Sequence, residues 1–339
     1  MAPLRSRPTR WEAAAVGLLI VWVTWVWVAG LLAGRPLSLG SPYVVAPVAL
    51  VAGVALGRTV AGRRRPGVAA AGLVIVTAVL LLAVLSTEGP AKRPIGYANA
   101  NAALAVQLIG LCGLAMLGAH RPRRLVLWAT TAGALAVVAA NASKAALAVA
   151  VPLVAVVALM SWRPARRARW VIVASALAMA TVAVGVVRLA AREQWPPAVV
   201  TALDPARQAL WSDALSLWAA HPVPGAGPGA FAEYSRLGGD TDTASAHSSI
   251  LQVGAETGAV GVVLFAVVIL AGLLWAARGD APDARVAAVA WTALVVHSFT
   301  DHLLEFVPVV LAAGITIGWA AATRSEELDV TKGEGPGTR

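Results

Sequence analysis

His247 lies in the stretch TASAHSSILQVGAETGAVGV (residues 243–262), where a polar segment gives way to a long apolar run. A neutral imidazole accepts a proton near neutral pH, which suits it to act as a general base. A histidine beside the N-cap of a helix at a wet interface would produce the same local pattern. The histidine alone leaves both interpretations open, and the surrounding residues must decide between them.

A second candidate, Arg207, lies in LDPARQALWSDALSLWAAHPVPGAGPGAF. Asp204 is a favourable N-cap and Pro205 suits the first helical position, so the pattern predicts a helix over about 205–220 that ends before Pro222. The apolar residues expected on the same helix face as Arg207 are Leu210, Trp211, Ala214 and Trp218. An arginine in such a stripe either extends to lipid headgroups or points inward at a phosphate, which guanidinium binds through pairs of oxygen atoms.

The segment PGAGPGAF holds three glycines, Gly225, Gly227 and Gly229, and superficially resembles a nucleotide-binding turn. No strand precedes it and no β-α-β pattern surrounds it, so a dinucleotide site is not expected. We predict a turn that brings backbone close to another element.

Composition shows which kind of scaffold must position these residues. Hydrophobic residues make up 59% of the 339 and charged residues 13%, with a mean hydropathy of +0.75. A soluble fold would have too little polar surface at this composition. The single cysteine, Cys112, excludes disulfides within the chain and thiolate metal clusters. The basic residues are dispersed between apolar runs and predict membrane topology rather than a nucleic-acid partner.

Apolar runs long enough to cross a bilayer, or nearly so, recur along the chain. They lie near 13–33, 43–57, 68–86, 99–119, 125–141, 143–161, 170–190, 250–277, 286–300 and 303–322. The predicted fold is all-α, a polytopic transmembrane helix bundle of about ten spans.

Orientation follows from the positive charges, because cytoplasmic connections are rich in lysine and arginine. With a cytoplasmic N-terminus, most of the 27 Lys and Arg fall on the cytoplasmic side. We therefore predict a multi-pass protein of the plasma membrane with both termini cytoplasmic. The predicted segments are a cytoplasmic stretch (1–12), seven spans (13–190), an extracytoplasmic loop with short amphipathic helices (191–249), three spans (250–322) and a disordered cytoplasmic tail (323–339).

The order and spacing of these motifs resemble one known family. Over residues 207–264, an arginine precedes a tryptophan, HP-x-x-G-x-G-P-G-x-F follows, and then come AH-x-S-x-L-Q and E-T-G. This pattern is similar to the O-antigen ligase and polymerase family of membrane glycosyltransferases. GYANANAALA and NASKAAL resemble upstream family motifs, with Lys144 where the family usually has arginine. The aspartate of HSFTDHLLEFVP, Asp301, resembles a recurrent family residue, and the family commonly has about twelve spans.

The resemblance implies a GT-C-like bundle that builds cell-envelope polysaccharide without a metal or cofactor. The implied donor is a glycan on a polyprenyl diphosphate such as undecaprenyl diphosphate, and the acceptor is a glycan or lipid-glycan. Transfer would be inverting and would occur at the outer face of the bilayer. His247 is then the candidate general base, while Arg207 and Lys144 would stabilise the departing diphosphate.

Other polar residues at the outer ends of spans are candidates for binding substrate. Lys92 and Arg93 are predicted to attract the diphosphate or to touch lipid headgroups. Asn101 and Ser143, with Asn99 and Asn141, would either bind sugar hydroxyls or cap helices.

His297, Asp301 and Glu305 recur at every fourth position and would form a metal-binding face on a continuous helix. A turn is predicted within this stretch, which favours Asp301 orienting another side chain, such as His247. Glu256 is predicted to be structural and to bond Gln252 one turn earlier.

Two functions of other classes remain open at this stage. A transporter or flippase of lipid-linked sugars would need polar residues near the bilayer midplane and repeated halves. The polar residues here gather at one face instead, which favours surface chemistry. A non-catalytic assembly partner is the third possibility, and only an activity assay separates it.

Overall fold

The computed structural model describes residues 10–62, 66–89, 92–162, 169–238, 243–278 and 281–333. It is all-helical, with 81% helix and no strand in this part of the chain. The elements are α1 (Arg10–Leu32), α2 (Pro42–Gly62), α3 (Pro66–Leu85), α4 (Ala98–Leu117), α5 (Arg121–Ala140), α6 (Lys144–Trp162), α7 (Arg169–Ala190), α8 (Pro197–Leu203), α9 (Pro205–Ala220), α10 (Ala230–Tyr234), α11 (Ser249–Ala276), α12 (Ala281–Phe299), the 3-10 helix η2 (Leu303–Glu305) and α13 (Val307–Gly333).

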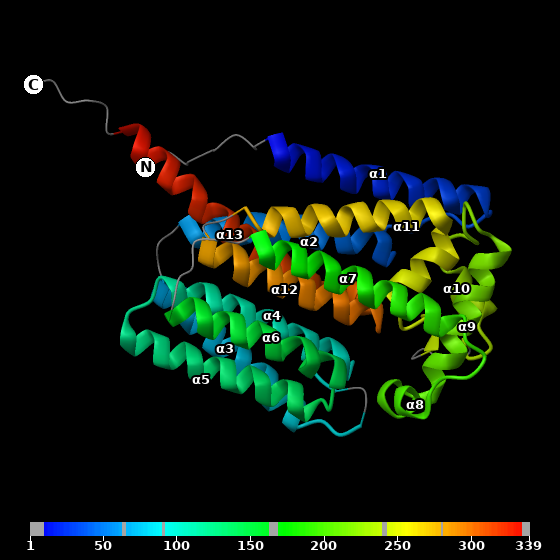
Figure 1. Cartoon of the computed structure of the whole chain (residues 1–339), viewed down its shortest axis with the longest axis horizontal. Helices are drawn as coiled ribbons and strands as arrows, with labels where there is room; N and C mark the ends of the chain where they lie inside the picture. The colour runs from blue at the N-terminus through cyan, green and yellow to red at the C-terminus, as the bar shows by residue number, and fades with distance from the viewer. Residues whose placement is uncertain are drawn as a thin grey trace, which may run out of the picture.

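The long helices form the polytopic bundle expected from the sequence. Within the described residues, eight helices, α1 to α7 and α11, are long and apolar enough to cross a membrane. Helices α12 and α13 occupy the places of the ninth and tenth expected spans, but α12 does not meet the same criteria and α13 has only a shorter apolar stretch, Val307–Ala322. Helices α8, α9 and α10 gather at one end of the bundle (Figure 1). The chain is therefore membrane-embedded, with a helical cap at one end.

Helix α4 forms the centre of the bundle. Its apolar window is 89% buried, whereas the other seven candidate spans are 17–33% buried and turn large apolar faces outward. Small residues such as Ala102, Ala103 and Ala105 let neighbouring helices approach it closely.

Helices α2 and α13 pack through paired glycines. Gly53 and Gly57 face Gly314 and Gly318, so each helix has two glycines four residues apart at the contact. An added Cβ on Gly53 would lie 2.9 Å from the Gly314 Cα, and one on Gly314 would lie 3.0 Å from the Gly53 Cα. Only glycine permits this backbone approach, which is a recurring mode of helix association in membranes.

Replacing Gly314 with valine is expected to lower the free energy of unfolding by about 1–3 kcal/mol, because the backbones must separate to admit the side chain. Thermal unfolding in detergent measures this loss. Gly72→Val is the matched control, since an added Cβ at Gly72 meets nothing within 4 Å. Equal unfolding temperatures for the two variants would contradict the close glycine contact.

The glycine-rich turn after α9 packs against a break in α11, as its composition predicts. The Ala226 and Gly227 amides donate to the carbonyls of Ala255 and Glu256, each at 2.9 Å. Gly258 has φ 66° inside α11, a left-handed conformation that suits glycine. This contact fixes α9 relative to the start of α11, where His247 lies.

The end of α13 differs from the expected tail. The sequence predicts disorder from 323, whereas α13 continues to Gly333. Glu326, Glu327 and Leu328 are good helix formers, and extending an existing helix requires no new nucleus. The remaining predicted tail, 334–339, and residues 1–9 lie outside the described residues.

Candidate active site around Asp301

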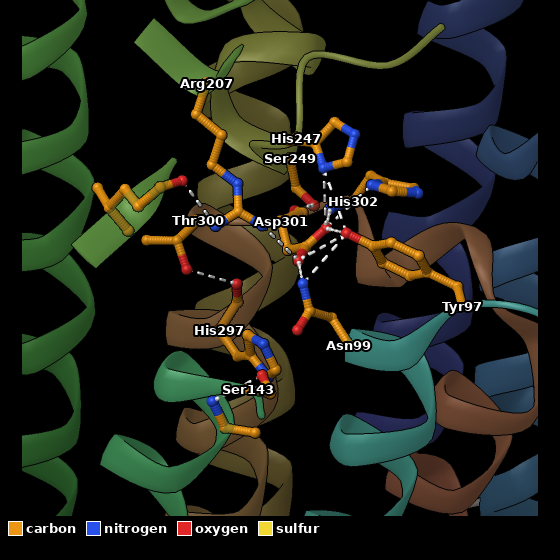
Figure 2. Close-up of polar contacts among 12 residues, drawn as sticks. Tyr97, Asn99, Ser143, Arg207, His247, Ser249, His297, Thr300, Asp301 and His302 are labelled. Carbon is orange, nitrogen blue, oxygen red and sulfur yellow. Dashed lines mark hydrogen bonds and ion pairs between the residues drawn. The ribbon is translucent and has the colours of Figure 1, made fainter. Parts of the chain in front are cut away.

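Asp301 lies in the turn between α12 and η2, and its side chain is 1% exposed. The helix stops at Phe299, as the expected break requires, so His297, Asp301 and Glu305 do not share one helical face. The turn instead aims the Asp301 carboxylate toward side chains from α4, α9 and the segment before α11 (Figure 2).

Five side chains converge on this carboxylate. They are Arg207 (Nη2 to Oδ2, 3.0 Å), His247 (Nδ1 to Oδ1, 3.5 Å), His302 (Nδ1 to Oδ1, 3.0 Å), Tyr97 (Oη to Oδ1, 2.9 Å) and Asn99 (Nδ2 to Oδ2, 2.6 Å). We call these residues, with Asp301, the Asp301 cluster. The two predicted catalytic residues, His247 and Arg207, thus meet at opposite oxygens of one buried carboxylate.

The protonation states in the cluster are set by burial and charge. Burial alone would raise the pKa of Asp301, but the neighbouring His247 and His302 rings and the Arg207 guanidinium hold that pKa well below its usual range. Burial and the Asp301 charge raise the pKa of the Tyr97 hydroxyl well above its ordinary value. Asp301 is therefore a carboxylate, and Tyr97 remains a protonated donor to it.

His247 adopts a strained backbone conformation, with φ 47°. This left-handed region costs about 1–3 kcal/mol for a residue other than glycine and persists only where the surroundings enforce it. The Trp211 indole donates to the His247 carbonyl at 3.3 Å, and the Ala246 amide donates to Gln252 at 2.6 Å. Ser248 then caps α11 by accepting from the Leu251 amide. In this conformation the Nδ1 edge of the ring faces Asp301.

Arg207 points into the protein. Helix α9 begins and ends where the sequence predicts, and Asp204 caps it by accepting from the Ala206 amide at 2.9 Å. Leu210, Trp211 and Ala214 bury the predicted apolar face. The Arg207 side chain is 16% exposed, so the alternative of extension to lipid headgroups does not describe it.

The structure places the other predicted substrate-binding residues away from direct contact with Asp301. Asn101 is fully buried, and its amide bonds the backbone of Lys92, Arg93 and Ile95. The Lys92 ammonium donates to the Ala140 carbonyl. In the conformation described here, Asn101 holds the loop before α4 rather than presenting its amide to a ligand.

Ser143 and Lys144 are engaged at the start of α6. The Ser143 hydroxyl accepts from the Ala146 amide at 3.3 Å, which is the capping role weighed in the sequence. The Lys144 ammonium donates to the Thr201 carbonyl in α8 at 2.8 Å. Arg93 is exposed. Substrate contacts by these residues remain predictions.

Glu256 has the structural role expected of it. Its carboxylate accepts from Gln252 at 2.7 Å, from the Tyr43 hydroxyl at 2.8 Å and from the Phe231 amide at 3.3 Å. These bonds join α2, α10 and α11 beside the cluster.

A metal ion has a different set of candidate ligands from the one weighed in the sequence. The ligand atoms of His247, Asp301 and His302 lie within 4.8 Å of one another, a grouping that could hold a cation. Arg207 bonds the same carboxylate, and its positive charge disfavours a second cation there.

The sequence did not identify Tyr97 and His302 as site residues. Tyr97 precedes α4 and stacks on Phe306 with ring centroids 5.4 Å apart, and His302 packs on Tyr97 at 4.8 Å. Asn99 was a candidate for sugar binding, yet it donates to Asp301. The sequence signal for these two residues was the tyrosine in GYANAN and the histidines in HSFTDH. No local periodicity relates the two segments, so their contact could not be predicted.

Residues 129–266 match the family model described as O-antigen ligase. The matched range includes Arg207 and His247, whereas Tyr97, Asp301 and His302 lie outside it. A comparison with curated proteins gave no match. Over residues 129–266, the match confirms the resemblance to the O-antigen ligase family that the motifs indicate.

Proposed function

We propose that the protein is an integral-membrane glycosyltransferase that ligates or polymerises a polyprenyl-diphosphate-linked glycan at the outer face of the plasma membrane. Transfer would be inverting and independent of metal. The observation that supports this most directly is the meeting of His247 and Arg207 at opposite oxygens of Asp301. One group suits proton removal and the other suits an anion, and glycan transfer from a diphosphate needs both.

His247 would act as the general base. Its Nδ1 faces the Asp301 carboxylate, which favours the tautomer with the proton on Nδ1 and makes Nε2 the basic nitrogen. Nε2 would take the proton from the acceptor hydroxyl as its oxygen attacks the anomeric carbon. Asp301 would stabilise the imidazolium that forms. A single displacement of this kind inverts the anomeric configuration.

Arg207 would stabilise the leaving group. As the glycosidic C–O bond breaks, its electron pair passes to the polyprenyl diphosphate, whose negative charge increases. The bonds from Arg207 to Asp301 and to the Leu203 carbonyl use one N–H on each terminal nitrogen, so the guanidinium retains further donors for phosphate oxygens. Asp301 holds the guanidinium in place while His247 and Arg207 act on opposite sides of the reacting carbon.

The orientation rests on charge. The last turns of α2, which carry Arg58, and the first turn of α5, which carries Arg121, Arg123 and Arg124, lie at the end of the bundle opposite the cap of α8 to α10. Under the positive-inside preference, the cap and the Asp301 cluster face the outer side, and both termini are cytoplasmic.

Metal independence is the part of the proposal that an activity assay tests most directly. Asp240 and Asp242 form a D-x-D pair in the sequence, and paired carboxylates can hold a divalent cation. Both residues lie outside the described part of the chain. Chelation therefore belongs in the first activity measurement.

The test is transfer by the purified full chain in nanodiscs, with an undecaprenyl-diphosphate oligosaccharide as donor and EDTA present. We expect glycosidic product and released undecaprenyl diphosphate in equal amounts, and a rate about 10²–10³-fold lower for Arg207→Ala. Arg192→Ala, at an exposed position in the loop of residues 191–249 and outside the Asp301 cluster, is the matched control and should retain the wild-type rate. Loss of activity in EDTA that manganese or magnesium restores would overturn metal independence. Movement of labelled donor across the bilayer without new glycosidic bonds would instead support a transporter.

A further inference from the structure

A cavity of about 530 Å³ opens beside the Asp301 cluster, between α1, α2, α11, α12 and α13. Its polar wall includes His302, Glu305, Ser249 and Gln252, and its apolar wall includes Trp22 and Phe265. His302 belongs to both the cluster and the cavity, so a ligand in the cavity would lie next to the proposed base. The mechanism above leaves this cavity without an occupant.

The charge of the cavity excludes one class of occupant. Among the residues that the structure describes, no lysine or arginine lines it, whereas Glu256 and Glu305 do. A diphosphate placed there would meet the side chains of Glu256 and Glu305 and no lysine or arginine, which is unfavourable at short range. The anionic part of the donor therefore belongs on the Arg207 side of Asp301.

The two glutamates differ in whether their carboxyl oxygens already accept hydrogen bonds from the protein. Glu256 already accepts hydrogen bonds from Tyr43, Gln252 and the Phe231 amide. The Glu305 side chain makes no hydrogen bond or ion pair with any residue in the described ranges. Glu305 faces the cavity, so its side chain is accessible to solvent even though protein surrounds it. Burial there raises the pKa of the Glu305 carboxyl.

We propose that this cavity binds the glycan acceptor through uncharged hydroxyl groups, with Glu305 as the residue that recognises them. The hydroxyls would bond Glu305 and Gln252, and the less polar faces or lipid portion would lie along Trp22 and Phe265. Ligand sites commonly combine a mostly apolar wall with a few placed polar groups. The inference rests on the proposed transferase function, because it divides one site into an anionic side and a hydroxyl side.

Binding can be measured without any transfer. The full chain in nanodiscs would carry Ser38→Cys on the cavity wall in a Cys112→Ala background, and maleimide labelling of the new thiol would be timed. The probes are hexyl maltoside, hexyl phosphate and geranyl diphosphate. We expect hexyl maltoside to slow labelling, with little protection by hexyl phosphate or geranyl diphosphate. A Ser86→Cys thiol at the end of α3, outside the cavity, should label at one rate with all three.

Glu305→Gln keeps the side-chain shape and should raise the half-protecting concentration of hexyl maltoside about tenfold, since the amide replaces one carboxyl oxygen with a nitrogen and a hydrogen bond to that oxygen is lost. Glu88→Gln, on an exposed site away from the cavity, should leave it unchanged. In transfer assays, Glu305→Gln should raise KM for the acceptor and not for the donor.

Equal protection by hexyl maltoside and hexyl phosphate would overturn the proposal. Stronger protection by geranyl diphosphate would assign the cavity to the donor's polyprenyl chain and overturn it as well. An unchanged midpoint in Glu305→Gln would remove Glu305 from recognition. Absence of transfer by the wild-type chain would sink the proposed function alone, because the labelling result does not depend on turnover.

Discussion

Replacing His247 with alanine is expected to lower kcat for glycan transfer by about 10²–10⁴-fold, the range that a positioned general base contributes. The acceptor hydroxyl would then have to lose its proton to water. Donor binding should change little, because Arg207 and Asp301 keep their 3.0 Å contact without the imidazole. The measurement is single-turnover transfer with saturating donor.

His221→Ala provides the control for that experiment. His221 ends α9, is exposed, and lies outside the Asp301 cluster. It should transfer at the wild-type rate and express equally well. Comparable rates for His247→Ala and His221→Ala would remove His247 from the reaction.

Asp301→Asn is expected to have an effect as large, about 10⁴-fold in kcat by analogy with the aspartate-to-asparagine change in a serine-protease triad. Two causes act together. The neutral amide no longer holds the Nδ1–H tautomer of His247, and it no longer pairs with the Arg207 guanidinium. An amide nitrogen in this position would also meet the Asn99 and Arg207 donors, which leaves buried donors unsatisfied.

Asp213→Asn separates lost chemistry from lost stability. Asp213 is likewise buried and paired with an arginine, Arg236, at 2.8 Å, but it holds the loop after α10 instead of the cluster. Both variants should unfold at lower temperature, and only Asp301→Asn should lose transfer. Equal losses of transfer in the two variants would mean that Asp301 acts only through folding.

The sequence predicts well the features that depend on residues close to one another in the chain. The helix from Pro205 to Ala220, its Asp204 cap and its buried apolar face follow from residues within one or two turns of each other. The end of α9 before the glycine-rich turn is also local, because proline and glycine interrupt helices whatever surrounds them. The orientation of His247 by Asp301 was expected once the break placed both residues at one end of the bundle.

The composition of the cluster could not be predicted in the same way. Tyr97 and Asp301 are 204 positions apart, and no periodicity relates them. Their contact exists because α4 is central and presents its first turn to the turn after α12. Asn101 is a case where the sequence suggested a site residue and the structure gives another role. Its position near Asn99 suggested that it binds sugar hydroxyls. Because it lies two positions further along α4, its amide points instead to the backbone of Lys92.

Chemical rescue of His247→Gly tests most directly whether an imidazole at this position takes the proton. Glycine tolerates the left-handed φ of 47° that His247 adopts, so this variant keeps the backbone and leaves space for a free imidazole. We predict that transfer is lost and that added imidazole restores it in part, with saturation, while Arg207→Ala gains nothing from imidazole. Transfer by His247→Gly at the wild-type rate without imidazole would contradict the account, because the proton would then leave by another route.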